Sequence, residues 1–341
     1  MRYIKPLDSL RALAVMLVVC SHWLGANATI SKLSLGLIGV NIFFVLSGYL
    51  ITNNLLLYKK QLGKGLQSTG FYIKKFYYRR FLRIVPVYFL LLLVVYAFNI
   101  HDFRGTLWWH LLYLSNFYFV FVKEAWEGAV SHLWSLSVEE QFYIFWPFLI
   151  LFLRSSWLKA LPIVLIVLAV VYRFFKPAEY ELWNFTLFGS LDALALGSLI
   201  AIYKIEKIKV KWVATILACV LLLAWLNYQF QLNQFLLCVN LIAFLLVISC
   251  KADLPKAVKY CLEIPFVLYI GRISYGIYLY HNFIPRPNLD LPKPLLLFIQ
   301  LAILIAISAL SYRFIEAPLL KLKNRKFNSP SSGEDLNRNG L

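Results

Sequence analysis

Arg11 and His22 are ionisable residues inside the first long apolar run of the chain. Such residues are costly in a nonpolar environment and by default mark a functional site. Eleven residues span about three helical turns and about 16 Å, so both side chains share one helix face. Arg11 alone could be an anchor at the helix end, and His22 could simply bond a neighbouring helix. Their shared face favours a pathway that runs along the helix.

A second group lies in the segment SHLWSLSVEEQFYIFWP (131–147). Its polar members are His132, Ser135, Ser137, Glu139 and Glu140. Adjacent helical residues point about 100° apart, so one glutamate should face the interior and the other needs its own partner. A carboxylate beside an imidazole fixes its tautomer and stabilises its protonated form, so either glutamate could serve His22. The alternative is a structural ion pair with an arginine.

Residues 58–83 carry eight basic side chains and no acidic one. Within this connecting segment, Arg80 and Arg83 are spaced i, i+3 and should share a helix face just before the next apolar run. Guanidinium groups suit bidentate phosphate binding. The competing interpretation is a topological anchor that attracts anionic lipid headgroups.

Further ionisable and polar residues lie in later apolar runs. The ninth run contains GRISYGIYLYH (271–281), with Tyr278 and an outer-end His281, although its tyrosines could be an aromatic belt. The tenth ends SYRFIEAP (311–318), where Arg313 and Glu316 can pair and Pro318 should close the helix. Asp192 in the sixth run could be a proton-transfer or a packing partner.

The elements that position these residues follow from the composition. Of 341 residues, 61% are hydrophobic and 15% charged, against about 45–50% and about 25% in soluble domains. Apolar runs long enough for membrane helices predict an all-α polytopic membrane protein with about ten transmembrane helices. The runs are 8–27, 33–57, 84–100, 133–153, 157–172, 183–203, 212–228, 235–250, 266–283 and 294–315. The aromatic stretch 107–122 should lie on or dip into the membrane face.

The basic residues indicate the orientation. Alternate connections hold 23 Lys and Arg and the others hold 7, out of 34 in the chain. Since cytoplasmic connections are enriched in these residues, both termini should be cytoplasmic. The net charge of +18 therefore reflects membrane topology, and no nucleic-acid partner is expected.

The remaining features predict little additional chemistry. Five scattered cysteines without a CxxC pair and histidines without HxxxH spacing indicate no metal site. Residues 327–341 (FNSPSSGEDLNRNGL) are polar and should form a disordered cytoplasmic tail after a membrane domain of residues 1–326.

Six motifs follow one another along the chain: LDSLRALAVMLVVCSH (7–22), GVNIFFVLSGYLI (39–51), RRFLRIVPVY (79–88), HLWSLSVEEQFYIFWP (132–147), SYGIYLYH (274–281) and SYRFIEAPL (311–319). In this order they resemble the bacterial acyltransferase-3 family of integral-membrane O-acyltransferases, which modify surface glycans. The resemblance covers nearly the whole chain. It implies the membrane-domain-only form, in a bacterial cytoplasmic (inner) membrane.

The resemblance also implies roles for individual residues. His22 would be the catalytic base, paired with Arg11 and assisted by Glu139, and Arg80 and Arg83 would engage acyl-CoA together with Arg11. Possible supporting residues are Asn41, His132, Ser135, Ser137, Glu140, Tyr278, His281 and Glu316. Many relatives carry an acidic residue where this chain has Asn41, which argues against a charged role at that position.

Together these patterns predict an O-acyltransferase. It would move an acyl group, by default acetyl, from cytoplasmic acyl-CoA to a hydroxyl of a cell-surface or lipid-linked saccharide, with no permanently bound cofactor. Direct transfer and an acyl-enzyme route both stay open. The alternative is a secondary transporter or flippase, for which buried His, Glu and Arg are also ordinary, although no Gly/Pro-broken pair of segments marks inverted repeats.

Overall fold

The computed structural model describes residues 3–25, 33–126, 128–176, 180–206, 210–230, 234–252, 254–285 and 291–325. The predicted tail, 327–341, lies outside these residues. Within them the protein is all-α, as predicted. The longer helices are α1 (Lys5–Leu24), α3 (Leu35–Leu62), α4 (Thr69–Ala97), α7 (Trp134–Phe152), α8 (Ser155–Phe175), α9 (Leu187–Ile202), α10 (Val210–Phe230), α11 (Phe235–Ser249) and α15 (Lys293–Ser311).

Short helical pieces connect or extend them. They are η1 (Ile100–Thr106), α5 (Leu107–Leu111), α6 (Ser115–Phe117), η2 (Tyr118–Val122), η3 (Ser131–Leu133), η4 (Glu181–Phe185), α12 (Lys256–Leu262), α13 (Pro265–Arg272), α14 (Ser274–Tyr280), η5 (His281–Phe283), η6 (Tyr312–Glu316) and α16 (Ala317–Arg325). The stretch 107–122 is thus a series of pieces each too short to cross a bilayer.

Seven of the described helical segments are long and apolar enough to cross a membrane. Of the ten predicted spans, the three not among them are 133–153, 235–250 and 266–283. The first forms α7 but carries two glutamates, and the second forms the 15-residue helix α11. The third is broken at Ile273 into α13 and α14, so the prediction of one continuous helix there is wrong.

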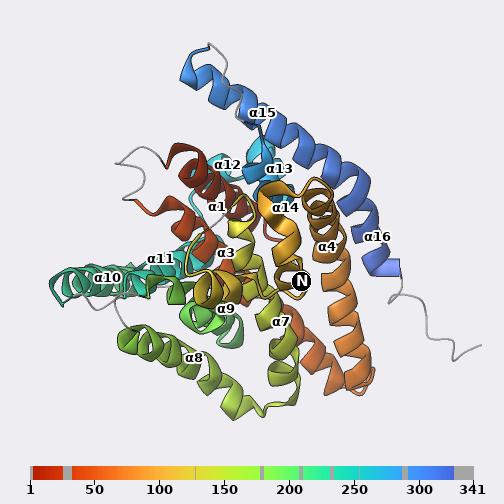
Figure 1. Ribbon diagram of the computed structural model, residues 1–341. Helices are drawn as coiled ribbons and strands as arrows, with labels where there is room; N and C mark the ends of the chain where they lie inside the picture. The colour runs from red at the N-terminus through yellow and green to blue at the C-terminus, as the bar shows by residue number, and fades with distance from the viewer. Residues whose placement is uncertain are drawn as a thin grey trace, which may run out of the picture.

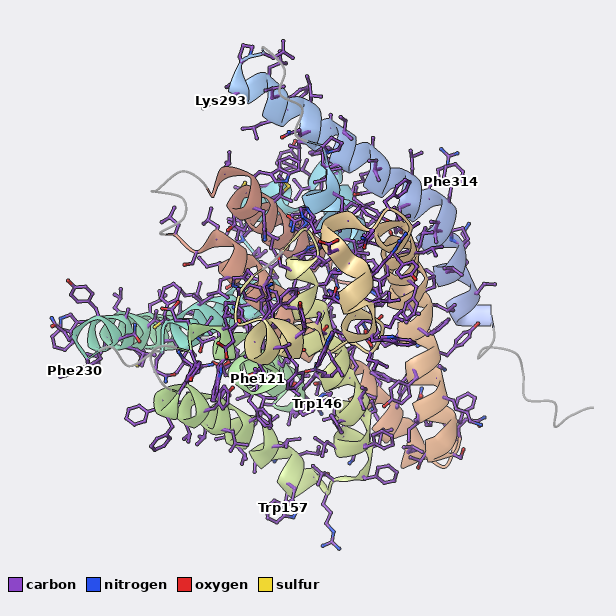
Figure 2. The ribbon with its side chains drawn as sticks, viewed as in Figure 1. Phe121, Trp146, Trp157, Phe230, Lys293 and Phe314 are labelled. Carbon is purple, nitrogen blue, oxygen red and sulfur yellow. The ribbon has the colours of Figure 1, made fainter. Side chains whose placement is uncertain are left out.

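The outer surface is apolar. Trp157, Phe230 and Phe314 lie at the periphery of the molecule (Figure 2), with 65%, 65% and 67% of their surface exposed. By contrast, Trp146 of α7 lies among the ribbons and is almost fully buried. Large exposed apolar surfaces are unstable in water and stable against lipid, so these outer faces suit a membrane.

Helix α3 is the centre of the bundle and contacts α1, α7, α9 and α11 (Figure 1). Its crossing with α9 is close: a Cβ on Gly197 would lie 2.0 Å from the carbonyl oxygen of Val45. Trp146 of α7 donates a hydrogen bond to Thr52 of α3 (2.7 Å), which bonds Ser198 of α9 (2.9 Å). This network fixes α7 and α9 against the helix between them.

Two predicted boundaries are wrong. The basic connection 58–83 is mostly helical, because α3 continues to Leu62 and α4 begins at Thr69, capped by the Ser68 hydroxyl. Pro318 does not close the last helix either. The π-turn η6 precedes α16, and Pro318 lies in the first turn of α16, where its missing N–H costs little.

Asp192 and Arg173 form a fully buried ion pair between α9 and α8. The guanidinium donates to both carboxylate oxygens, at 3.1 and 2.6 Å, and to the carbonyl oxygen of Gly189 at 2.7 Å. Arg173 follows the predicted run 157–172 and is therefore expected in the connection after it, whereas the structure buries it in α8. Asp192 therefore has a packing partner.

Candidate functional site

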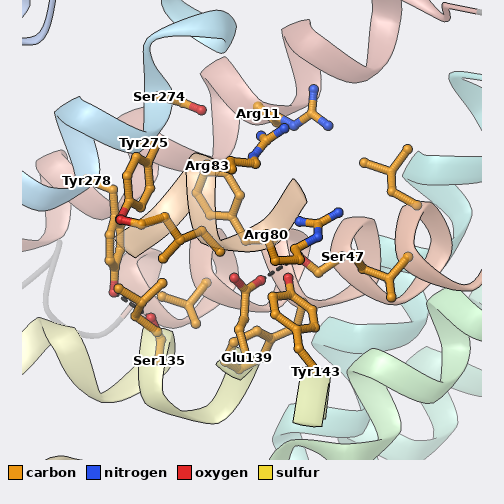
Figure 3. Close-up of a pocket in the computed structure, with 17 residues that line it drawn as sticks. Arg11, Ser47, Arg80, Arg83, Ser135, Glu139, Tyr143, Ser274, Tyr275 and Tyr278 are labelled. Carbon is orange, nitrogen blue, oxygen red and sulfur yellow. Dashed lines mark hydrogen bonds between the residues drawn. The ribbon is translucent and has the colours of Figure 1, made fainter. Parts of the chain in front are cut away.

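A cavity of about 110 Å³ lies between α1, α3, α4, α7 and α14 (Figure 3). Six residues that the sequence singles out line it: Arg11, Arg80, Arg83, Ser135, Glu139 and Tyr278. They come from four helices, so only the packing of the bundle brings them together. We call this space the inner cavity.

A second cavity, of about 390 Å³, adjoins the first and is called here the arginine cavity. Both are lined by Arg11, Leu50, Arg80, Arg83 and Tyr275. The shared walls form one path from the first residues of α1 to the middle of α7 and α14.

The three arginines differ in their partners. Arg11 donates to Asp8 one turn earlier, and Asp8 also accepts a hydrogen bond from the hydroxyl of Tyr3. The guanidinium carbon of Arg80 lies 5.1 Å from the ring centroid of Tyr143. Among the described residues, neither Arg80 nor Arg83 forms an ion pair. Two guanidiniums that no carboxylate of the described residues holds at ion-pair distance therefore face the path, with Glu139 in the same cavity, and they suit a phosphorylated or otherwise anionic ligand.

The two adjacent glutamates have separate environments. Glu139 faces the inner cavity and accepts a hydrogen bond from Ser47 of α3, at 2.5 Å (Figure 3). Glu140 lines neither cavity, and its buried Oε1 has no hydrogen-bond partner among the described residues. Glu139 is thus the glutamate that faces the interior.

His22 belongs to a cluster of three histidines. Its ring centroid lies 4.8 Å from that of His281, and the His281 and His132 rings are also 4.8 Å apart. The members come from α1, η3 and η5, and none lines either cavity. The His22 ring thus contacts His281, whereas Glu139 bonds Ser47.

Hydrogen bonds to the backbone indicate the tautomers. Nδ1 of His22 lies 2.9 Å from the carbonyl oxygen of Val18, and Nδ1 of His281 lies 2.6 Å from that of Tyr278. Because a carbonyl only accepts, each neutral ring carries its proton on Nδ1. Nε2 is then the basic nitrogen. Nε2 of His281 is buried without a partner among the described residues.

Ser135 and Tyr278 connect the inner cavity to this cluster. Their hydroxyl oxygens are 2.6 Å apart, and the Tyr278 hydroxyl lies 2.6 Å from the carbonyl oxygen of His132. Tyr278 has one proton to donate, which goes to the carbonyl, so Ser135 donates to Tyr278. The Tyr278 ring is 5.8 Å from that of His281. The inner cavity thus ends at Tyr278, whose ring lies near His281, and His281 in turn contacts the ring of His22.

Other predicted residues lie elsewhere. Asn41 is buried and bonds the carbonyl of Leu37. Ser137 is buried against Ser115, 2.8 Å away. Glu316 lines the arginine cavity, whereas Arg313 is exposed and forms no ion pair with it, so the predicted pairing is wrong.

Several cavity residues were not predicted as site residues. They are Asp8, Ser47, Asn54, Tyr143, Arg272 and Tyr275. Two of them have a sequence signal: Asp8 precedes Arg11 by three residues on a helix, and Arg272 is an ionisable residue inside the predicted run 266–283. As for metals, no group of three His, Cys, Asp or Glu in the described part of the chain has the geometry to hold an ion. In the histidine cluster, the rings of His22 and His132 each contact the ring of His281.

Comparison with known proteins adds a family and several relatives. Residues 4–314 match the acyltransferase-3 family, described as an acyltransferase domain. The chain is 30% identical to the peptidoglycan O-acetyltransferase OatA of Listeria monocytogenes, over 94% of this chain and 56% of the relative. It is 28% identical to a putative O-acetyltransferase of Staphylococcus aureus, over 94% and 58%. For the putative peptidoglycan O-acetyltransferase YrhL of Bacillus subtilis, the values are 29%, 96% and 56%.

The chain thus spans a little over half the length of these curated relatives. No solved structure matches it. The family match covers most of the chain and includes five of the six motifs, the first four residues of the sixth, most of the cavity-lining residues and the histidine cluster. The protein is therefore a member of the acyltransferase-3 family of membrane acyltransferases.

Proposed function

We propose that this protein transfers an acetyl group from cytoplasmic acetyl-CoA to a hydroxyl of a cell-wall saccharide, with peptidoglycan as the first acceptor to test. The observation that carries the proposal is the path from Arg80 and Arg83 through the inner cavity to the histidine cluster. The names of the relatives support acetyl and peptidoglycan.

The proposed setting is a bacterial cytoplasmic membrane, crossed ten times with both termini inside. The distribution of basic residues supports this orientation, since 23 lie in the connections assigned to the cytoplasm and 7 in the others. Helix α7 would cross despite its two glutamates, because Glu139 lies in a cavity inside the protein. The arginine cavity would then open to the cytoplasm, where acetyl-CoA is available.

The donor would bind with its acyl end innermost. Arg80 and Arg83 suit its phosphates because both guanidiniums reach the path without a bound carboxylate. The pantetheine arm is long and thin, and the separation of Arg11 and His22 along α1, about 16 Å, is of the same order. The thioester would pass Ser135 and Tyr278 and come to rest at the histidine cluster, within reach of His22.

His22 would act as the general base, through Nε2, on a saccharide hydroxyl that enters from the outer side. The hydroxyl oxygen forms a bond to the acetyl carbon as the carbon–sulfur bond breaks. The hydroxyl proton passes to Nε2 of His22 and finally to the sulfur of CoA. Glu139, which accepts a hydrogen bond from Ser47, would use its negative charge to stabilise positive charge that develops beside the inner cavity during the transfer.

The test uses purified protein in proteoliposomes with acetyl-CoA and a peptidoglycan fragment, and mass spectrometry of the product. His22→Ala should lower the transfer rate by about 10²- to 10⁴-fold. Normal transfer by a folded, membrane-inserted His22→Ala protein would exclude His22 as the base.

The Arg80→Ala/Arg83→Ala variant tests the donor site. It should raise the KM for acetyl-CoA and leave the KM for the acceptor unchanged. A change confined to the acceptor would contradict the assignment. Movement of labelled substrate across the membrane without any acetylated product would instead identify a transporter.

A further inference from the structure

A third, larger cavity of about 1040 Å³ lies beside the arginine cavity, and we call it the lysine vestibule. Its walls come from the start of α1, from α3, from the end of α9 and the segment after it, from the segment after α11 and from the helix α12. Tyr3 and Ile4 line both the vestibule and the arginine cavity. Since three of these wall segments belong to connections assigned to the cytoplasm, the vestibule adjoins the proposed donor entrance.

The vestibule has an excess of positive charge. Four lysines and two glutamates line it: Lys5, Lys204, Lys251, Lys259, Glu206 and Glu263. Lys5 pairs with Glu263 at 3.3 Å, and Lys251 donates to the carbonyl of Ile205. In the described part of the chain, Lys204 and Lys259 form no ion pair. These two exposed ammonium groups are therefore available to an anion.

Lys204 lies in the turn that ends α9, directly after the C-cap residue Tyr203. Its φ of 51° belongs to the left-handed turn that commonly follows a helix. The N–H groups of Lys204 and Ile205 bond the carbonyl oxygens of Ala201 and Ile200, at 3.3 and 3.0 Å, so this turn fixes the backbone of Lys204 at the wall of the vestibule.

An aromatic surface lies at the boundary between the two cavities. The Tyr3 side chain is 57% exposed, while its hydroxyl bonds Asp8. An exposed aromatic ring that is tethered at its hydroxyl suits stacking by a planar base. Tyr49 also lines the vestibule, but the ammonium of Lys251 occupies its face, 4.7 Å from the centroid.

We propose that the lysine vestibule binds the nucleotide end of the acyl-CoA donor, the adenosine bearing a 3′-phosphate. The inference rests on the proposed function, because it assumes that acyl-CoA is the donor. The pyrophosphate of the donor would lie at Arg80 and Arg83 in the arginine cavity, with the adenine near Tyr3 and the 3′-phosphate near Lys204 and Lys259. The volume is of the order of ligand pockets, about 300–1,000 Å³.

The experiment compares Lys204→Ala/Lys259→Ala with the matched control Lys60→Ala/Lys64→Ala, in the full chain in phosphatidylcholine nanodiscs. All four lysines are exposed, and the control removes two charges from another connection assigned to the same membrane face, outside the vestibule. The measurements are the KM for acetyl-CoA and the inhibition constant of adenosine 3′,5′-bisphosphate, which carries the nucleotide without the thioester.

The vestibule variant should raise both constants about tenfold, or ~1.4 kcal/mol, with kcat at saturation and the KM for the acceptor unchanged. The control should leave both constants within about twofold of wild type. Failure of the bisphosphate to compete with acetyl-CoA in the wild type, or equal effects in the two variants, would overturn the inference.

Two further outcomes separate the alternatives. If the vestibule variant keeps its KM but loses a stimulation of activity by phosphatidylglycerol, the vestibule binds a lipid phosphate and the nucleotide assignment is wrong. If the wild-type protein does not use acetyl-CoA at all, the proposed function fails first. If instead the wild type uses acetyl-CoA and depends on His22 while the vestibule variant keeps its KM and inhibition constant, the nucleotide site in the vestibule is refuted. That result leaves the proposed function intact.

Discussion

The buried ion pair between Arg173 and Asp192 gives a quantitative prediction about stability. Asp192→Asn keeps the shape of the side chain and removes its charge, so it leaves the guanidinium without a counter-ion. Both side chains are fully buried, and water cannot replace the lost carboxylate. Removal of one partner from a buried pair costs about 3–5 kcal/mol, because the other charge remains unpaired.

This cost is large beside the net stability of a typical protein, about 5–15 kcal/mol. The carbonyl of Gly189 and the amide oxygen of Gln234 still accept from Arg173, at 2.7 and 3.3 Å, which limits the loss to the range given. For a chain of this size, about 2 °C per kcal/mol predicts a fall in Tm of about 6–10 °C.

The assay is thermal unfolding of the detergent-purified protein, followed by fluorescence-detected size exclusion. The double variant Arg173→Met/Asp192→Asn removes both charges and should recover most of the lost Tm, since no unpaired charge is left in the interior. A Tm of Asp192→Asn within about 1 °C of wild type, or a double variant no better than the single one, would refute the reasoning.

Three other predictions concern the rest of the bundle. Burial lowers the pKa of His110 to about 4, in α5 outside the spanning segments. In the unfolded chain His110 has an ordinary pKa near 6.5, so between about pH 6.5 and 4 the unfolded chain binds a proton that the folded protein does not. The free energy of unfolding therefore falls as the pH drops through this range, by up to ~1.4 kcal/mol per pH unit. His110→Phe should flatten this part of a Tm-against-pH curve, and an unchanged slope would contradict the assignment. Gly197→Ala, whose Cβ would lie 2.0 Å from a carbonyl oxygen, should reduce the monodisperse yield severely, whereas Gly105→Ala, with open space around it, should not; equal yields would argue against the α3–α9 crossing. Ser47→Ala removes the hydrogen-bond donor to Glu139. A hydrogen bond to a charged group contributes about 1.5–3 kcal/mol, so its loss should lower kcat about ten- to a hundredfold and leave the KM for acyl-CoA constant. If steady-state kinetics show a change in KM alone, the variant has a defect in donor binding and the prediction is wrong.

Much of the fold was predictable from local sequence. Apolar runs of about 20 residues predict membrane helices, and α1, α3, α8, α9, α10 and α15 follow from them. Boundaries were predicted less well. Polar residues 58–83 resemble a connection, yet helix α4 extends through them because a Ser68 cap starts it early and water tolerates its basic side chains.

The candidate site was predicted only in part. Arg11, Arg80, Arg83, Ser135, Glu139 and Tyr278 do line one cavity. The partner that the sequence suggested for His22 was a glutamate, whereas the structure puts His281 against its ring. Similarly, Arg313 and Glu316 have suitable spacing for an ion pair, but they lie on different faces of the π-turn η6. Arg313 is exposed, whereas Glu316 lines the arginine cavity.

By itself the sequence determined the class of protein and the motifs of the family, since hydropathy and residue spacing act within one helix. Only the tertiary structure decided which side chains meet. His22, His132 and His281 are separated by more than a hundred residues each, and Ser47 lies 92 residues from Glu139. Contacts between helices depend on how each one is rotated and packed against its neighbours. That packing is a property of the whole bundle, and no single helix encodes it.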